Sequence, residues 1–163
     1  MSNVENNELV EDKILQLVTF RIGNEEFGFD IFKVKEINKM MDITQIPNSK
    51  SSVKGVVNLR GSVIPVVSLR NKLNFPEAEY GKSTRIIVVE YKSKSIAFIV
   101  DEVSEVLRID SSIIEKTPEM ATSVETAYIK GVAKLENRLL ILLDLDEVLN
   151  EKEELELEKV ESN

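Results

Sequence analysis

An internal repeat constrains the fold of this chain more than any other feature of its sequence. Residues 53–73 read VKGVVNLRGSVIPVVSLRNKL, and residues 129–149 read IKGVAKLENRLLILLDLDEVL. At an offset of 129 − 53 = 76, six residues of the first stretch have identical counterparts in the second, namely Lys54, Gly55, Val56, Leu59, Leu69 and Leu73, and the next residue, Asn74, matches Asn150. A second match, at an offset of 96 − 27 = 69, aligns Phe29, Val34 and Glu36 with Phe98, Val103 and Glu105. Because both matches fall in the same order, they indicate a duplicated unit rather than chance similarity of Val/Leu-rich strands.

The duplicated unit is predicted to be a small β structure. Short runs rich in β-branched residues alternate with turns over residues 15–80, and again over residues 84–150. One copy alone would bury little apolar surface, so we expect one all-β domain made of two small barrels. Helical spacing of Leu145, Val148 and Leu149 predicts a short C-terminal helix. Residues 1–14 are expected to form a flexible N-terminus, and residues 151–163 a solvated acidic tail.

Two local features stay open or carry a special constraint. The apolar residues at 27, 29 and 31 have strand spacing, whereas Ile31, Val34 and Ile37 also fit one helical turn, so periodicity does not decide between them. Pro65 lies within a predicted strand and has no backbone N–H, so we expect it at a sheet edge or a bulge.

Composition excludes several classes of chemistry. The 163 residues contain no Cys and no His, which rules out thiol nucleophiles, Ser-His-Asp triads and zinc sites built from those ligands. A formal net charge of −8 disfavours nucleic-acid binding, which needs clustered Lys and Arg. The N-terminus lacks the pattern of a signal peptide, and no apolar run reaches membrane-spanning length, so a cytoplasmic protein without membrane insertion is expected.

Three stretches of the chain resemble the CheW family, the coupling proteins of bacterial chemotaxis. They are FGFDIFKVKEI, KGVVNLRGSVIPVVSLR and IAFIVDEVSEVL, and the likeness extends over residues 15–150. The resemblance implies two five-stranded SH3-like β-barrels with a shared apolar interior. It also implies a non-catalytic adaptor without a cofactor, recruited to membrane receptor arrays. Its partners would be the cytoplasmic tips of chemoreceptors and the regulatory domain of the histidine kinase CheA.

Arg60 is the first candidate site residue, because an always-charged side chain stands between two apolar runs. One interpretation is structural: Arg60 pairs with a nearby carboxylate, Glu36 among them, and stabilises a hairpin. The other is functional: its fork of donors binds a partner, and Gly61 allows the partner's backbone to approach. The second copy has Glu136 and Asn137 at the matching place, which suggests that the fold itself does not require the arginine.

The family resemblance implies further contact residues, each with a structural alternative. Val34 and Val106 fit core packing as well as an exposed contact, and the recurrence of Gly55 as Gly131 fits a backbone requirement. Met120 follows Glu119 in a loop that is longer in the second copy, which suits partner binding, although the family often has an aromatic residue there. The implied receptor contacts are Glu36, Thr44, Arg60, Gly61 and Val106, and the implied kinase contacts are Val34, Gly55, Glu119 and Met120.

Other functional classes remain as alternatives. A hydrolase could use paired carboxylates, such as Asp101 with Glu102 or Glu105, or Asp144 with Asp146. A barrel that binds nucleic acid would need a basic groove with exposed aromatic residues, and the chain has six Phe and three Tyr. Within the family, similar domains end the kinase or precede a receiver domain, and the length of this chain favours the independent coupling protein.

Overall fold

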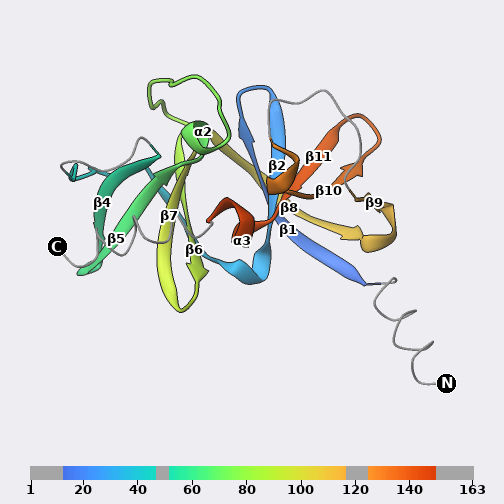
Figure 1. Cartoon of the computed structure of the whole chain (residues 1–163), viewed down its shortest axis with the longest axis horizontal. Helices are drawn as coiled ribbons and strands as arrows, with labels where there is room; N and C mark the ends of the chain where they lie inside the picture. Colours follow the sequence, from blue (N-terminus) through green and yellow to red (C-terminus); the bar gives the residue numbers. More distant parts are fainter. Residues whose placement is uncertain (1–12, 47–51, 117–124, 150–163) are drawn as a thin grey trace.

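Two β-sheets lie side by side in the computed structural model of the chain, which describes residues 13–46, 52–116 and 125–149 (Figure 1). Sheet A contains, in spatial order, β8 (Glu102–Asp110), β1 (Ile14–Ile22), β2 (Glu25–Asp30), β11 (Leu139–Leu143), β10 (Ile129–Lys134) and β9 (Ile114–Glu115). Sheet B contains β3 (Val34–Lys39), β6 (Arg85–Tyr91), β7 (Lys94–Val100), β5 (Ser62–Ser68) and β4 (Val53–Leu59). The predicted all-β class is therefore confirmed.

The helices of the described part are short and sit at strand ends. The α-helices are α2 (Leu69–Lys72) and α3 (Leu145–Val148), and the 3-10 helices are Ile31–Lys33, Ser111–Ile113 and Thr126–Tyr128. Ser68 caps α2 and Asp144 caps α3, each through a side-chain oxygen that accepts backbone N–H bonds. These caps are 144 − 68 = 76 residues apart, so the two α-helices are equivalent parts of the repeat. The predicted C-terminal helix is confirmed as α3.

The two copies of the repeat exchange strands between the sheets. By the offsets of 69 and 76, strands β1 to β5 correspond in turn to β6, β7, β8, β10 and β11. Sheet B inserts β6 and β7 of the second copy between β3 and β5 of the first, and sheet A inserts β1 and β2 of the first between β8 and β11 of the second. The copies meet in the parallel pairs β5–β7 and β2–β11. Each sheet thus contains strands from both copies.

Irregularities in the strands are repeated as well. The register of β3 shifts between Val34 and Glu36, and the register of β8 shifts between the equivalent residues Val103 and Glu105. The pairing of β4 with β5 shifts at Gly55, and that of β10 with β11 shifts at Gly131. Such bulges bend a strand and increase its twist, so the two sheets share their curvature as well as their strand order.

One apolar core joins the sheets. The largest cluster of buried side chains combines Phe20, Phe27 and Phe29 of sheet A with Phe98 and Val89 of sheet B. Phe20 lies 5.0 Å from Phe29 and Phe29 lies 5.6 Å from Phe98, measured between ring centroids, within the range of favourable aromatic pairs. A separate cluster lies within each sheet's own strands. The expected shared interior is therefore confirmed. Each copy depends on the other to bury these side chains.

The structure decides both open points of the sequence. Residues 31–33 form a 3-10 helix between the strands β2 and β3, so both periodicities were partly right. Pro65 lies in β5, which has neighbours on both sides, but the pairing with β7 begins only at Val66. On the other side, Val56 faces Pro65 and exchanges its backbone hydrogen bonds with Thr44 instead, at 2.8 and 2.9 Å. No donor is needed from Pro65, which is how a central strand tolerates it.

Candidate protein-binding faces

The Arg60 turn has a geometry that its residue types explain. Arg60 and Gly61 have φ angles of 52° and 88°, and they connect the paired residues Leu59 and Ser62. Two successive positive φ angles are typical of the tight hairpin turn that matches strand twist. The Asn58 side chain accepts a hydrogen bond from the Gly61 N–H at 2.9 Å. The turn therefore fixes the position from which the Arg60 side chain projects.

Arg60 forms an ion pair with Glu36, which closes sheet B between its edge strand β3 and the β4–β5 turn. The Asn38 side chain donates a second hydrogen bond to Glu36 at 3.2 Å. The hydrogen bonds from Arg60 and Asn38 stabilise the carboxylate and lower the pKa of Glu36. The predicted pairing of the two residues is confirmed, and Arg60 remains 69% exposed in its side chain.

The second copy contains the same ion pair from a different sequence position. Arg138, in the strand-free segment before β11, donates to Glu105 at 2.8 Å, and Glu105 is the counterpart of Glu36. Arg138 also contacts the buried carboxylate of Glu26 at 3.1 Å. Arg138 thus makes the equivalent pair from two residues beyond the place that the repeat predicts, so the absence of an arginine at that place does not show that the fold can do without one. A direct alignment of the repeats misses it.

Exposed apolar residues recur near both ion pairs in the sequence. Ile37 follows Glu36 and is 39% exposed, and its counterpart Val106 follows Glu105 and is 52% exposed. The β5 residue Val63 and its counterpart Leu139 in β11 are 62% and 45% exposed. We use face B for the sheet B residues Ile37, Val63, Glu36 and Arg60, and face A for the corresponding sheet A residues Val106, Leu139, Glu105 and Arg138, grouping them by sheet and by repeat position. Sequence reasoning selected Val106 but missed the other three apolar residues, although Ile37 and Val106 were already aligned by the repeat.

Thr44 and Gly55 come together at the edge of β4. Thr44 is exposed and forms an isolated bridge with Val56, and a Cβ on Gly55 would overlap the Thr44 backbone. Gly131 lies close to β9, where a Cβ would come within 2.5 Å of Ile114 Cγ2. The backbone explanation for the recurring glycine is therefore confirmed. Val34 is partly buried against the shared core, in accordance with its packing alternative.

Several other expectations concern regions or features beyond the two faces. Glu119 and Met120 lie outside the described residues, as does the acidic tail. Phe32, in the 3-10 helix Ile31–Lys33, is 87% exposed and was not selected from the sequence. Among the described residues, none of the helices is long and apolar enough to span a bilayer, and acidic side chains do not gather into a group that could hold a metal ion.

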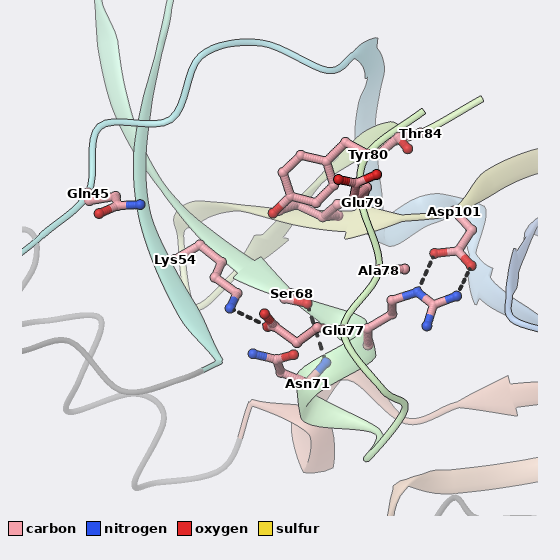
Figure 2. Close-up of a pocket in the computed structure, with 12 residues that line it drawn as sticks. Gln45, Lys54, Ser68, Asn71, Glu77, Ala78, Glu79, Tyr80, Thr84 and Asp101 are labelled. Atoms are coloured by element: carbon pink, nitrogen blue, oxygen red, sulfur yellow. Dashed lines mark hydrogen bonds and ion pairs between the residues drawn. The ribbon is translucent and has the colours of Figure 1, made fainter. Parts of the chain in front are cut away.

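A polar cavity of about 250 Å³ opens at the end of sheet B (Figure 2). Its walls are already joined by ion pairs: Arg70 contacts Asp101 through two hydrogen bonds of 2.9 and 2.7 Å, and Lys54 contacts Glu77 at 2.8 Å. The Gly23 N–H also donates to Asp101. Partial burial opposes ionisation of Asp101, but the bonds from Arg70 and Gly23 outweigh it and lower the pKa of this carboxyl. These pairs fasten loops to the sheets, so Arg70, Asp101, Lys54 and Glu77 have structural partners.

Each of the two joined sheets carries exposed apolar residues and a fixed ion pair, a combination that suits protein binding. Comparison with known proteins agrees. The family model described as CheW-like domain matches residues 16–153. The chain is 37% identical to the chemotaxis protein CheW of Klebsiella aerogenes, over 85% of this chain and 83% of that protein. It is 36% identical to CheW of Bacillus subtilis, over 84% of this chain and 88% of that protein.

A solved structure supports the same assignment. The scaffolding protein TtCheW from Thermoanaerobacter tengcongensis superposes with a TM-score of 0.79 at 34% identity, covering 86% of this chain and 96% of that one. The chain belongs to the CheW family, the non-catalytic scaffolding proteins that couple receptors to the kinase CheA in chemotaxis. The hydrolase and nucleic-acid alternatives are thereby set aside.

Proposed function

We propose that this protein binds the cytoplasmic tips of chemoreceptors and the regulatory domain of CheA at the same time. The observation that carries the proposal is the duplication of the exposed face. Faces A and B have equivalent apolar residues and equivalent ion pairs, but they lie on different sheets of one body. The receptor and the kinase are assigned to different residues of this body, so it can hold both partners in a fixed relation, and movement of one partner then biases the state of the other.

The receptor contact is proposed to include Glu36, Arg60 and Gly61 of face B, Thr44 beside it, and Val106 of face A. The exposure of Arg60, Thr44 and Val106 supports this assignment. Glu36 is the least accessible of the charged pair, with a side chain 27% exposed, so we expect it to act by orienting Arg60. Ile37 and Val63 extend the apolar part of the same contact.

The kinase contact is proposed to include Val34, Gly55, Glu119 and Met120. Val34 and Gly55 have little accessible surface of their own, so their part is to set the shape of the β3 and β4 backbone. We further propose that the protein resides in the cytoplasm and is recruited to receptor arrays at the membrane. Simultaneous binding of two partners raises the effective concentration, so modest single affinities suffice to assemble such an array.

Chemical-shift mapping with each partner separately tests the proposal. A chemoreceptor tip fragment should shift the resonances of Arg60, Ile37 and Val106, and the CheA regulatory domain should shift a different set that includes β4. Addition of the second partner should leave the first set of shifts in place. If each partner displaced the other at every concentration, simultaneous binding would be excluded.

A further inference from the structure

An apolar cavity of about 320 Å³ opens at the end of sheet A. Leu15, Leu17, Ile114 and Leu142 form much of its wall, and three of the charged groups at its edge are lysines: Lys13, Lys116 and Lys130. None of these lysines takes part in an ion pair among the described residues, whereas Lys54 and Lys134 do. The opening therefore combines an apolar wall, in which Leu15 and Ile114 are partly exposed, with three lysines and one aspartate, Asp30.

Sheet B has the equivalent opening, and there it is covered. Lys54, Thr84 and Ile99 line the sheet B cavity at the positions that Lys130, Leu15 and Asp30 occupy in sheet A, since 130 − 54 = 76, 84 − 15 = 69 and 99 − 30 = 69. Glu77, Ala78, Glu79 and Tyr80 also line the sheet B cavity, and they belong to the segment that leads into β6. The Lys54–Glu77 ion pair ties this segment to β4 (Figure 2).

The repeat identifies the segment that would cover sheet A. Strand β1 is the counterpart of β6, so residues 8–11 precede β1 as residues 77–80 precede β6, at the offset of 69. The counterpart of Glu77 is Glu8, and the counterpart of its partner Lys54 is Lys130. Both members of the Lys54–Glu77 ion pair therefore have counterparts of the same residue type, Lys130 and Glu8.

The composition of residues 1–12 also fits this opening. The segment MSNVENNELVED contains four acidic residues and no basic one, which complements the lysines at the edge. Leu9 and Val10 stand where the sheet B segment has Ala78 and Glu79, and the sheet A cavity is correspondingly the apolar one. Lys13 is held beside the cavity, because its carbonyl accepts a hydrogen bond from the Ser111 N–H at 2.8 Å. The five residues from Lys13 back to Glu8 can span up to about 17 Å when extended.

We propose that residues 5–12 of this chain dock across the sheet A opening, with Leu9 in the apolar cavity and Glu8 paired with Lys130. The N-terminal segment then covers sheet A as the β5–β6 segment covers sheet B. Covering this leucine surface also makes the segment a competitor for any other protein that binds there.

A spin label at position 9 tests the docking directly in the full chain. The sequence has no Cys, so Leu9→Cys provides a single attachment site. The label should broaden the methyl resonances of Leu15, Leu17 and Leu142, and it should leave those of Ile64 and Val66 in sheet B sharp. A mixed sample of spin-labelled copies and copies that carry only the methyl isotope label tests for exchange between molecules. Broadening that appears only between such copies would overturn the proposal, because the occupant of the cavity would then be a second copy. Absence of selective broadening, as expected of a flexible N-terminus, would overturn it as well.

Charge reversal tests the predicted ion pair. Glu8→Lys and Lys130→Glu should each lower the ratio of docked to free segment about two- to five-fold, as expected for an exposed ion pair, and the double reversal should restore it. Lys54→Glu is the matched control, because it breaks the equivalent pair of sheet B and should leave the broadening at Leu15 unchanged. Equal broadening in Glu8→Lys, which alters a residue outside the described sheets, would contradict the assignment of Glu8 to Lys130.

Discussion

Gly55 and Gly131 occupy equivalent positions, but a side chain at each would meet a different obstacle. At Gly55 the φ angle is 149°, and the obstacle is the backbone of Thr44, which cannot move without breaking the Thr44–Val56 bridge. At Gly131 the nearest atom is the Cγ2 methyl of the Ile114 side chain rather than backbone. The two equivalent glycines therefore differ in how well they should tolerate a side chain.

We expect Gly55→Ala to lower the free energy of unfolding by about 3 kcal/mol or more, because it combines an unfavourable φ with a backbone clash. Gly131→Ala should cost less, because the φ angle there is not in the left-handed region and the nearest obstacle is a side-chain methyl of Ile114, although the Glu115 carbonyl at 3.1 Å must also shift slightly. Gly81→Ala is the control, since a Cβ there meets nothing within 4 Å. Denaturant unfolding of the three variants should give this order, and an equal loss at Gly55 and Gly81 would contradict the close approach.

The two arginines that close the sheets should differ in their importance for stability. Arg138→Ala leaves the Glu26 carboxylate, whose side chain is 5% exposed, without its ion pair, and we expect a loss of about 1–3 kcal/mol. Arg60→Ala leaves Glu36 with its Asn38 hydrogen bond, so we expect little change in thermal stability but weaker receptor binding. Arg108→Ala, at an exposed position of β8, is the control for binding. A large drop in melting temperature for Arg60→Ala would assign Arg60 a mainly structural role.

At the residue scale, the sequence predicted the Arg60–Glu36 pair because Arg60 stands between two apolar runs and because Glu36 recurs as Glu105 in the second copy. It did not predict Arg138, because the repeat aligns Arg60 with Glu136, and a side chain as long as arginine can reach the same carboxylate from two residues away. Phe32 was missed for a different reason. A phenylalanine among strand residues suggests burial, and its exposure depends on the 3-10 helix that turns it outward.

The element α2 joins the two sheets through one side chain. Arg70 of α2 binds Asp101 in the segment between β7 and β8, and Asp101 also accepts the N–H of Gly23 from the β1–β2 turn. Another donor of Arg70 contacts the carbonyl of Pro76 in the loop before β6. A single ion pair thus fastens the helix, the turn and the loop together.

The lowered pKa of Asp101 makes this fastening dependent on pH. A carboxyl whose pKa is lower in the folded than in the unfolded state stabilises the fold above its unfolded pKa of about 3.9, and this contribution is lost as the pH falls through the folded value. The free energy of unfolding should therefore fall below about pH 4, and part of that fall should be missing in Arg70→Met. Urea titrations of both proteins across this range measure the difference, and parallel curves would show that Asp101 does not contribute.

At the element scale, strand positions followed from β-branched runs and turn residues, and α3 followed from its apolar spacing. The two-residue strand β9 did not, because Ile114 and Glu115 become a strand only through contact with β10, which lies far along the chain. The single bridge at Thr44 is its counterpart in sheet B, and it likewise depends on a tertiary contact.

For the whole molecule, the exchange of strands determines which pieces can fold. The first copy contains β3, β4 and β5 of sheet B but lacks β6 and β7, which lie between β3 and β5. It also contains β1 and β2 of sheet A without the neighbouring β8 and β11. Neither copy can therefore complete a sheet or bury the shared core.

We expect a chain split between Tyr80 and Gly81 to give two fragments that are each unfolded and that reassemble when mixed. The cut lies in the exposed loop before β6 and interrupts no strand. Amide spectra should be poorly dispersed for each fragment and native-like for the mixture. A well-dispersed spectrum from either fragment alone would show that one copy is an autonomous unit. The sequence predicted the duplication but not this exchange, because identical residues reveal which strands correspond and not which strands pair.

The chain passes between the sheets at two places only within the described residues, the 3-10 helix Ile31–Lys33 and the residue Asp101. These places are equivalent in the repeat, since 101 − 32 = 69, yet Asp101 is clamped by Arg70 while Phe32 points its ring into solvent. The two equivalent crossings between the sheets are thus held by unequal numbers of contacts, although the body derives from a duplication. If a bound neighbour rotates one sheet relative to the other, the rotation should be centred on the crossing at Asp101, which Arg70 holds. The crossing at residues 31–33, where Phe32 is exposed, should then change its backbone conformation first.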